Sequence, residues 1–115
     1  MREFTVRFHL ADTEYMTALR LACGALGSVH ELDVDSIEDF KVCVTESAII
    51  LKNCGFDELC AVFSGCGGLC CTLTGVGGEP CVGDNELSLA LISALVGECD
   101  ITRNGEIIER VKISV

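Results

Sequence analysis

Residues 36–53 read SIEDFKVCVTESAIILKN, a pattern that predicts a helix with one buried face. Apolar side chains recur in it every three or four residues, the spacing that places them on one side of an α-helix. Ser36 can cap the first turn, with Asp39 three residues further on. We expect the apolar side to contribute a stripe to the hydrophobic core, made of Ile37, Phe40, Val44, Ala48 and Leu51.

The chain before this helix predicts one strand and one further helix. Residues 4–10 alternate apolar and polar side chains, as a strand with one buried face does. Asp12 or Thr13 can then cap a helix that carries apolar residues at helical spacing and ends near residues 27–28. Residues 30–35 are expected to form a loop.

The chain after this helix begins with a hairpin. Two strands are predicted for residues 57–64 and 69–74, joined by a glycine-rich turn at residues 65–68. A loop with the only proline of the chain then covers residues 75–85.

The last third of the chain predicts a helix and a second hairpin. Asp84 or Asn85 can cap a strongly apolar helix that ends at Gly97. The Asn104-Gly105 pair is typical of a type I′ hairpin turn. The strands on either side of this turn cover residues 98–103 and 106–115.

The predicted order β-α-α-β-β-α-β-β indicates the fold class. Strands joined as hairpins pair antiparallel, and the apolar sides of helices must be buried against the sheet. We therefore expect an α+β fold with a mostly antiparallel sheet and helices on one face. Neither a repeat nor a linker divides the chain, so residues 1–115 are expected to form a single domain.

The amino-acid composition of the chain favours some classes of binding partner over others. The formal net charge is -10 and half of the residues are hydrophobic. Nucleic acids and anionic membranes are bound chiefly by Lys and Arg, so a basic protein partner fits this charge better. No apolar run reaches the length of a membrane span, and the first residues carry no signal-peptide pattern. These features predict a cytoplasmic protein that binds neither nucleic acid nor membrane.

Residues 41–56, KVCVTESAIILKNCGF, resemble the first motif of the histidine-kinase-like (GHKL) ATPase superfamily. The resemblance is to the small anti-sigma-factor serine kinases, which usually read K-V-A-V-S-E-A-C-T-N-x-x-x-H-G-Y there. Glu46 falls on the catalytic acidic residue of the family, and Gly55 and Phe56 fall on its Gly-Tyr pair. Ile50 stands where the family has the Asn that binds Mg²⁺, and Cys54 stands where it has His.

The resemblance also implies a nucleotide site with several departures from the family pattern. Ile50 has no oxygen for Mg²⁺, whereas the Asn53 amide, about two turns after Glu46, could offer one at a different metal position. The segment LTGVG, residues 73–77, keeps both glycines of the Asp-x-Gly-x-Gly motif and lacks its Asp. Adenine would then be bound through Thr72, Thr74 or a water molecule. The candidate nucleotide-binding residues are Asn53, Thr74, Gly75 and Gly77.

This chain also departs from the family pattern at the lid. A Gly-x-Gly-Leu run that binds phosphate on backbone N–H groups is replaced by residues 85–89, NELSL. Glu86 would lie near the phosphates and repel them. We therefore expect no bound cofactor, or Mg-ATP if the nucleotide site survives, with Glu46 either vestigial or a general base.

Three functions are compatible with these residues. The first is a bacterial regulatory protein that resembles anti-sigma factors, has lost or weakened ATP binding, and acts by binding a sigma factor or an anti-anti-sigma-like protein, with homodimers as in the family. The second is an active ATP-dependent serine/threonine kinase of the same type. The third is a metal or redox protein built on Cys66, Cys70, Cys71 and Cys81. Their spacing matches no standard C-x-x-C pair, and neighbours in a strand point to opposite faces, which favours cysteines that serve as small core residues.

Overall fold

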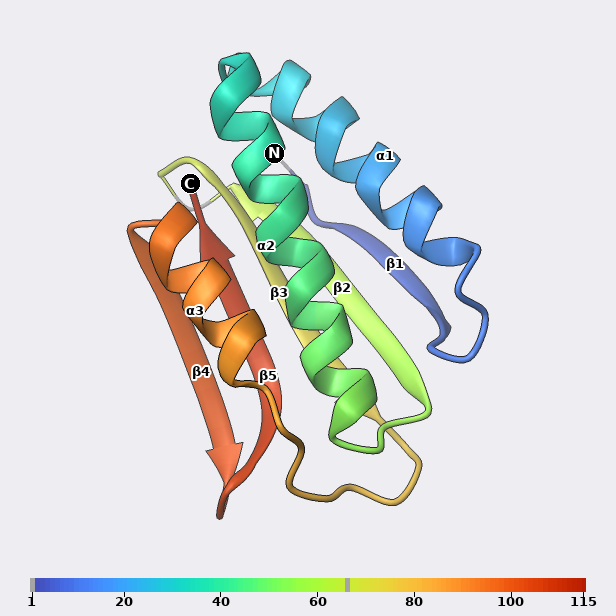
Figure 1. The fold of residues 1–115 in the computed structure, drawn as a ribbon. Helices are drawn as coiled ribbons and strands as arrows, with labels where there is room; N and C mark the ends of the chain where they lie inside the picture. Colours follow the sequence, from blue (N-terminus) through green and yellow to red (C-terminus); the bar gives the residue numbers. More distant parts are fainter. Residues whose placement is uncertain (1, 66) are drawn as a thin grey trace.

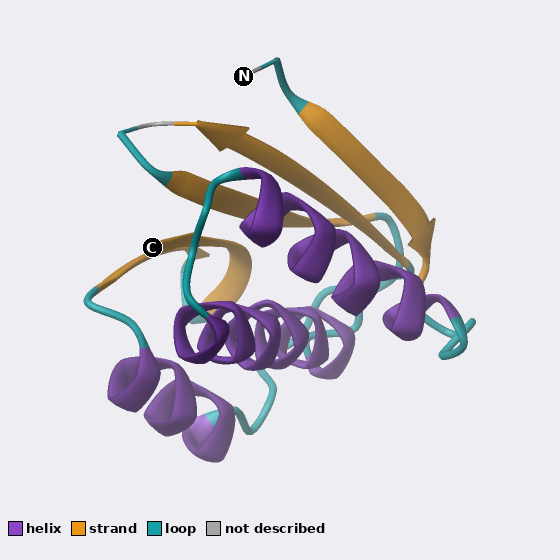
Figure 2. Ribbon diagram, turned by 90° about the horizontal axis from the view of Figure 1, so that it is seen from above, coloured by secondary structure: helices purple, strands orange, loops and turns teal. Residues whose placement is uncertain are grey.

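The computed structural model describes residues 2–65 and 67–115, and it has a layer of helices on one face of a sheet (Figures 1 and 2). The elements follow the order predicted from the sequence, and the α+β class with a mostly antiparallel sheet and helices on one face is confirmed. Their bounds are β1 Phe4–His9, α1 Tyr15–Val29, α2 Val34–Asn53, β2 Glu58–Gly65, β3 Leu69–Val76, α3 Glu86–Leu95, β4 Glu98–Asn104 and β5 Ile107–Ser114.

The sheet has the strand order β1-β2-β3-β5-β4, and every neighbouring pair is antiparallel. Side chains alternate between its two faces along each strand. One row of paired residues crosses all five strands on the helix side, formed by Val6, Ala61, Leu73, Val111 and Ile101. This register places the apolar residues of every strand under the helices.

Helix α2 occupies the middle of the helix layer, with α1 and α3 on its two sides (Figure 1). Phe40, Val44 and Leu51 of the predicted stripe are fully buried, and Ile37 is partly buried. The Phe40 ring meets the Phe63 ring of β2 edge-on, with 6.2 Å between the ring centroids. The core therefore lies between α2 and the sheet.

The starts and ends of the helices differ from the prediction. Asp33, not Ser36, caps α2, because Asp33 Oδ1 accepts a 2.7 Å hydrogen bond from the backbone N–H of Ser36. Glu14 occupies the N-cap of α1 and makes no side-chain cap bond, so neither Asp12 nor Thr13 has the expected role. Helix α1 also continues past Gly27 to Val29. Gly27 lets Ile37 pack closely, since a Cβ there would lie 2.7 Å from Ile37 Cγ1.

The predicted type I′ turn at Asn104-Gly105 is wrong. Asn104 pairs with Ile107, so the two turn residues are Gly105 and Glu106. Positive φ occurs at Gly105 and not at its neighbours in the turn, which is the pattern of a type II′ turn. The turn is shifted by one residue because the strand register, and not the Asn-Gly pair alone, sets its position.

The second face of the sheet, which we call the open face, carries no helix (Figure 2). Its residues come from alternate strand positions and are mostly small or polar, among them Cys60, Thr72, Thr74, Lys112 and Asp100. Within the described part of the chain, no helix combines the length and the apolar character needed to cross a membrane.

Candidate functional site

Glu46 lies on α2 and reaches α3. Ser88, in the first turn of α3, donates a 2.7 Å hydrogen bond from Oγ to Glu46 Oε2. Ser88 is buried and Glu46 is partly buried. The carboxylate that resembles the family's catalytic acid is thus bonded to the neighbouring helix.

Ile50 follows Glu46 by one helical turn and is completely buried within the core cluster. Helical spacing places both residues on the α3 side of α2. A branched hydrocarbon in that position contributes to packing and offers no oxygen to a cation. Ile50, at the position that resembles the family's Asn, is therefore part of the hydrophobic core.

Asn53 and Asn85 join the end of α2 to the start of α3. Asn53 Nδ2 donates to Asn85 Oδ1 at 3.2 Å, and Asn85 Nδ2 donates to Cys54 Sγ at 3.4 Å. Asn85 is buried at the N-cap position of α3, and its side chain makes no cap bond because these contacts occupy it. Asn53, the candidate nucleotide-binding residue at this place, is therefore bonded to another protein side chain.

The loop from Gly77 to Asn85 lies directly on the C-terminal end of α2. Glu79 N–H donates to the Gly55 carbonyl at 3.1 Å, and Cys81 N–H donates to the Cys54 carbonyl at 2.7 Å. Gly78 has a φ of +71°, and a Cβ at this residue would overlap the Gly55 carbonyl. The glycines of this loop thus permit a close backbone contact.

Gly75 and Thr74 lie on opposite faces of β3. A Cβ at Gly75 would overlap the ring of Phe56, so the aromatic side chain covers this glycine on the helix side. Thr74 Oγ1, on the open face, accepts a 3.3 Å hydrogen bond from Arg110 Nε. Gly77 lies beyond the strand, near the side chain of Asp57.

The predicted site residues are therefore brought together only in part. Glu46 and Asn53 share the contact between α2 and α3, and Gly75 and Gly77 lie at the end of β3 beside the residues that follow α2. The Thr74 side chain lies on the open face, so the sheet separates it from Glu46 and Asn53. Each of these groups except Gly77 contacts another part of the protein closely.

Of the predicted cysteine cluster, Cys66 lies outside the described residues, and the three described members do not share one site. Cys71 is buried on the helix side of β3, and Cys70 lies on the open face. Cys81 lies on the loop at the other end of the sheet, where its Sγ is 3.8 Å from the Asn53 carbonyl. Among residues 2–65 and 67–115, no three His, Cys, Asp or Glu side chains are placed to bind one metal ion.

Several thiols outside that cluster are deeply buried. Cys23 and Cys43 are completely enclosed. Burial raises the pKa of the Cys23 thiol to about 12 and that of the Cys43 thiol to about 11. Within the cluster, burial likewise holds the pKa of the Cys71 thiol well above its ordinary range. These thiols are neutral at physiological pH and pack as small apolar groups.

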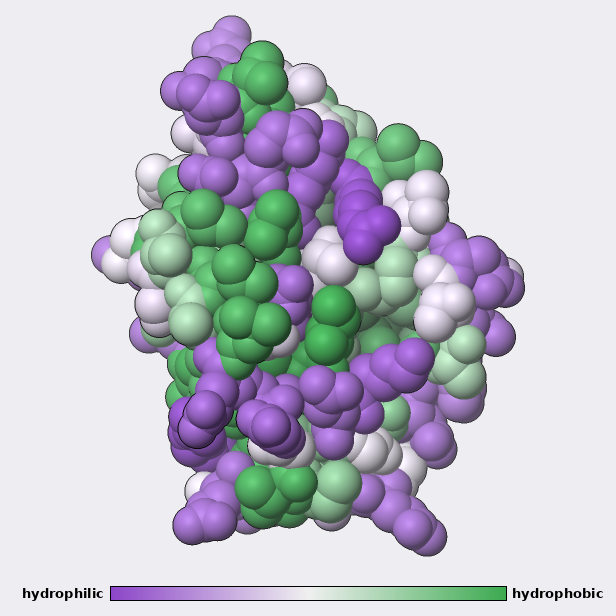
Figure 3. All heavy atoms as spheres, in the orientation of Figure 1, coloured by the Kyte–Doolittle hydropathy of each residue, from purple (hydrophilic) through white to green (hydrophobic). Residues whose placement is uncertain are grey.

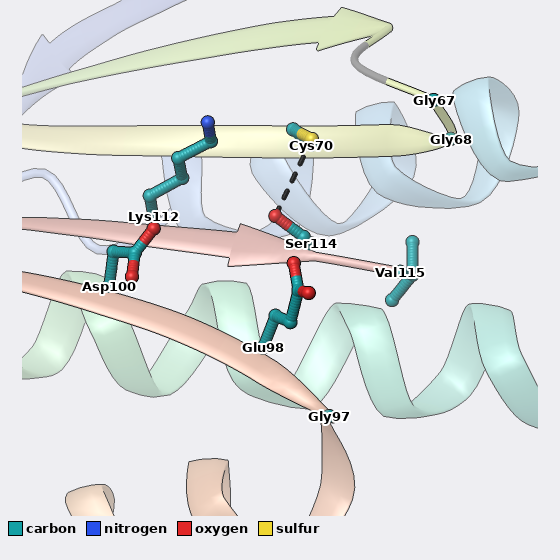
Figure 4. Close-up of a pocket in the computed structure, with 9 residues that line it drawn as sticks. All are labelled: Gly67, Gly68, Cys70, Gly97, Glu98, Asp100, Lys112, Ser114 and Val115. Atoms are coloured by element: carbon teal, nitrogen blue, oxygen red, sulfur yellow. Dashed lines mark hydrogen bonds between the residues drawn. The ribbon is translucent and has the colours of Figure 1, made fainter.

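A hollow of about 580 Å³ lies on the open face, where β3, β5 and β4 meet (Figure 4). Glu98 and Asp100 of β4 face Ser114 and Lys112 of β5, and Cys70 Sγ lies 3.5 Å from Ser114 Oγ. Its walls combine polar strand residues, with charges of both signs, with the glycines at 67, 68 and 97 and Val115. Sequence analysis singled out only Cys70 among them, since alternation along single strands does not reveal which strands are neighbours.

Helix α3 exposes an apolar surface that sequence analysis did not foresee. Leu87 is 76% exposed and Leu91 is 36% exposed, and Val42 of α2 is 38% exposed. Figure 3 shows an apolar area that extends over α3 and the adjoining part of α2. We call Leu87 and Leu91 the α3 surface. The signal was present in the sequence, because LSLALISAL has too little polar character for a helix with one solvent-facing side.

No protein-family model matches the chain, and a search of curated proteins gave no match. The resemblance to GHKL ATPases therefore depends on the motif of residues 41–56 and on the order of the helices and strands.

Proposed function

We propose that this chain is a bacterial regulatory protein of the GHKL ATPase type, similar to anti-sigma factors, that acts by binding a partner protein and has lost or weakened ATP binding. The hydrogen bond between Ser88 and Glu46 is the observation that carries the proposal. It engages the one acidic residue of the motif, the residue that resembles the family's catalytic acid, with α3.

Binding of Mg-ATP would require several contacts to break. The Ser88–Glu46 bond and the backbone bonds from Glu79 and Cys81 to the end of α2 would be lost. Each neutral hydrogen bond contributes roughly 0.5–1.5 kcal/mol, and a bond to a charged group contributes about 1.5–3 kcal/mol. Ile50 would remain without an oxygen for the metal. The contacts of a bound nucleotide would first have to offset the free energy of these lost hydrogen bonds, and only the remainder would be observed as affinity.

The α3 surface supports the protein-binding part of the proposal. Exposed apolar patches with polar surroundings are typical of protein interfaces. Asp84, Glu86 and Glu98 are exposed near the two ends of α3, and the chain carries a net charge of -10. A partner with an apolar anchor surrounded by Lys and Arg would fit both features. We therefore propose a sigma factor or an anti-anti-sigma-like protein as the partner, which places the protein in the cytoplasm.

Calorimetry with Mg-ATP and Mg-ADP tests the nucleotide part. We expect no saturable heat at millimolar nucleotide and no rise in Tm, whereas a ligand at 100 times its Kd would stabilise the fold by about 2.7 kcal/mol. If heat is observed, the same titration of the Glu46→Gln variant serves as the control. Saturable binding, with transfer of phosphate to a serine that Glu46→Gln abolishes, would establish the active kinase instead.

Fluorescence anisotropy against purified sigma factors and anti-anti-sigma-like proteins tests the partner part. Leu87→Gln and Leu91→Gln should each weaken binding roughly tenfold or more, as loss of an interface anchor does. Leu21→Gln is a matched control, because Leu21 is 69% exposed on α1. Equal affinity of all three variants and the unchanged protein would refute the α3 surface as the contact.

A further inference from the structure

A groove runs along the contact between α1 and α2, on the side of the molecule seen in Figure 3. It consists of two adjoining hollows of about 230 and 280 Å³, which share Arg20 and Thr45 on their walls. No described residue of the candidate nucleotide site lines the first hollow. Of that site, Glu46 lines the second hollow.

The first hollow combines an apolar wall with cations and hydroxyl groups. Its hydroxyls belong to Thr13 and Thr45, and its cations belong to Arg20 and Lys52. None of the described residues that line it carries a carboxylate. The remaining wall is apolar and consists of Leu10, Met16, Ala48 and Ile49. Ligand pockets commonly have this composition, in which a few polar groups fix the orientation of a ligand with an apolar body.

Arg20 is held in place by a buried acceptor. Its Nε donates a 3.2 Å hydrogen bond to Thr45 Oγ1, and Thr45 is only 7% exposed. This bond uses one of the five N–H groups of the guanidinium and leaves the fork of its two terminal nitrogens for a carboxylate or phosphate. Thr45 therefore acts as a positioning residue for Arg20.

Arg20 and Lys52 form no ion pair with any described residue, although the chain has 18 acidic residues and only 8 basic ones. By contrast, Arg7 pairs with Glu58 and Lys41 pairs with Glu38. Lys52 stands in the last turn of α2, where the helix dipole favours a cation. Arg20 is in the middle of α1, where its exposed side chain is bonded to Thr45.

We propose that the first hollow binds a small organic monoanion with an apolar body, of the class of medium-chain carboxylates. Arg20 and Lys52 hold the anionic group, and the body lies against Met16, Ala48 and Ile49. Glu38 and Glu46 line the adjoining hollow, so a ligand with several negative charges is disfavoured there. This site is separate from the α3 surface and extends beyond the proposed function, since it would bind whether or not a protein partner does.

Amide chemical-shift mapping of the full chain with sodium octanoate tests the site. We expect saturable shifts in residues 13–20 and 45–52, weaker effects with acetate, and weaker effects with inorganic phosphate, because the first lacks the apolar body and the second carries more charge. Absence of saturation, shifts centred elsewhere, or equal effects of phosphate and octanoate would each overturn the proposal.

Substitutions at Arg20 and Thr45 test whether these side chains bind or position the ligand. Arg20→Gln should lower the octanoate affinity roughly tenfold, as loss of one charge-assisted contact does. Thr45→Val keeps the shape of the side chain and should weaken binding by a smaller factor, with Arg20 still present. Arg103→Gln makes the same change of charge on β4, at the opposite edge of the sheet, and should leave the affinity unchanged. Equal affinity of Arg20→Gln and Arg103→Gln would refute the site.

Discussion

Ser88 Oγ donates a 2.7 Å hydrogen bond to Glu46 Oε2, and this bond joins two helices whose bonded residues are 42 positions apart in the chain. Glu46 is the residue of the motif that resembles a catalytic acid. Its carboxylate is bonded to α3, and the residue before Ser88 on this helix, Leu87, is exposed to solvent. The relationship links the candidate nucleotide site to the candidate partner surface.

Ser88→Ala should destabilise the fold by about 1 to 2 kcal/mol, because a hydrogen bond to a charged group is lost near the protein surface. Urea denaturation gives the change in the free energy of unfolding. Ser93→Ala on the exposed side of the same helix is the control, and we expect it to stay within about 0.5 kcal/mol of the unchanged protein. Equal stability of the two variants would show that the Glu46 bond contributes nothing.

Ile50→Asn restores the residue type found in the family and should destabilise the protein by about 3 to 5 kcal/mol. The substitution removes a fully buried side chain and encloses an amide in the core. Ile50→Val should cost only about 0.5–1.5 kcal/mol. Denaturant midpoints of both variants check the prediction. A stable Ile50→Asn protein that gains Mg-ATP binding would contradict it.

Gly78→Ala and Gly105→Ala should differ although both glycines have positive φ, +71° and +64°. A methyl group at Gly105 would project into open space, so the cost there is the backbone term of about 1–2 kcal/mol. At Gly78 the methyl group would overlap the Gly55 carbonyl, which should add about 1–3 kcal/mol. Thermal denaturation of the two variants measures this difference, and equal Tm values would mean that the loop is not held against α2.

Stability should fall as the pH rises above about 9, because burial raises the pKa of Cys23 from an ordinary 9.0 to about 12. The folded state keeps the thiol proton through this range while the unfolded state loses it, so alkali favours unfolding. The stabilisation is complete below pH 9 and is lost between pH 9 and about 12, with a slope of at most about 1.4 kcal/mol per pH unit for this thiol.

Cys23→Ala provides the comparison for this pH dependence. Urea denaturation at pH 8 and pH 10 should show a smaller loss of stability in the variant than in the unchanged protein, since one titrating thiol is gone. The difference between the two losses reports the contribution of the Cys23 thiol. Identical losses in the two proteins would show that Cys23 does not titrate on unfolding.

The elements of the fold could be predicted because their signals are local. The alternation in residues 4–10 and the helical spacing in residues 36–53 depend only on neighbours in the chain, and the structure has a strand and a helix there. Helix ends were harder to predict, because Asp33 and Ser36 are both good caps and only the backbone path selects Asp33. The hairpin turn was shifted for a similar reason, since pairing of Asn104 with Ile107 fixes its position.

The candidate site could be predicted only as a set of residues, not as an arrangement. A motif match pointed to Glu46, but Ser88 as its partner has no signal in the sequence, because nothing local links α2 to α3. Thr74 next to Gly75 was expected at the same ligand, yet adjacent strand residues face opposite sides and the register brings Thr74 to Arg110. Arg20 and Thr45 escaped notice because they meet only when α1 packs on α2.

The amino-acid sequence by itself determined the order of helices and strands, the apolar stripe of α2 and the acidic character of the chain, since these follow from periodicity and composition. The tertiary structure alone decided which groups meet: Glu46 with Ser88, Asn53 with Asn85, and Arg20 with Thr45. The reason is physical. Periodicity fixes the face on which a side chain lies, whereas its partner depends on how distant elements pack, and that is set by burial of the whole core.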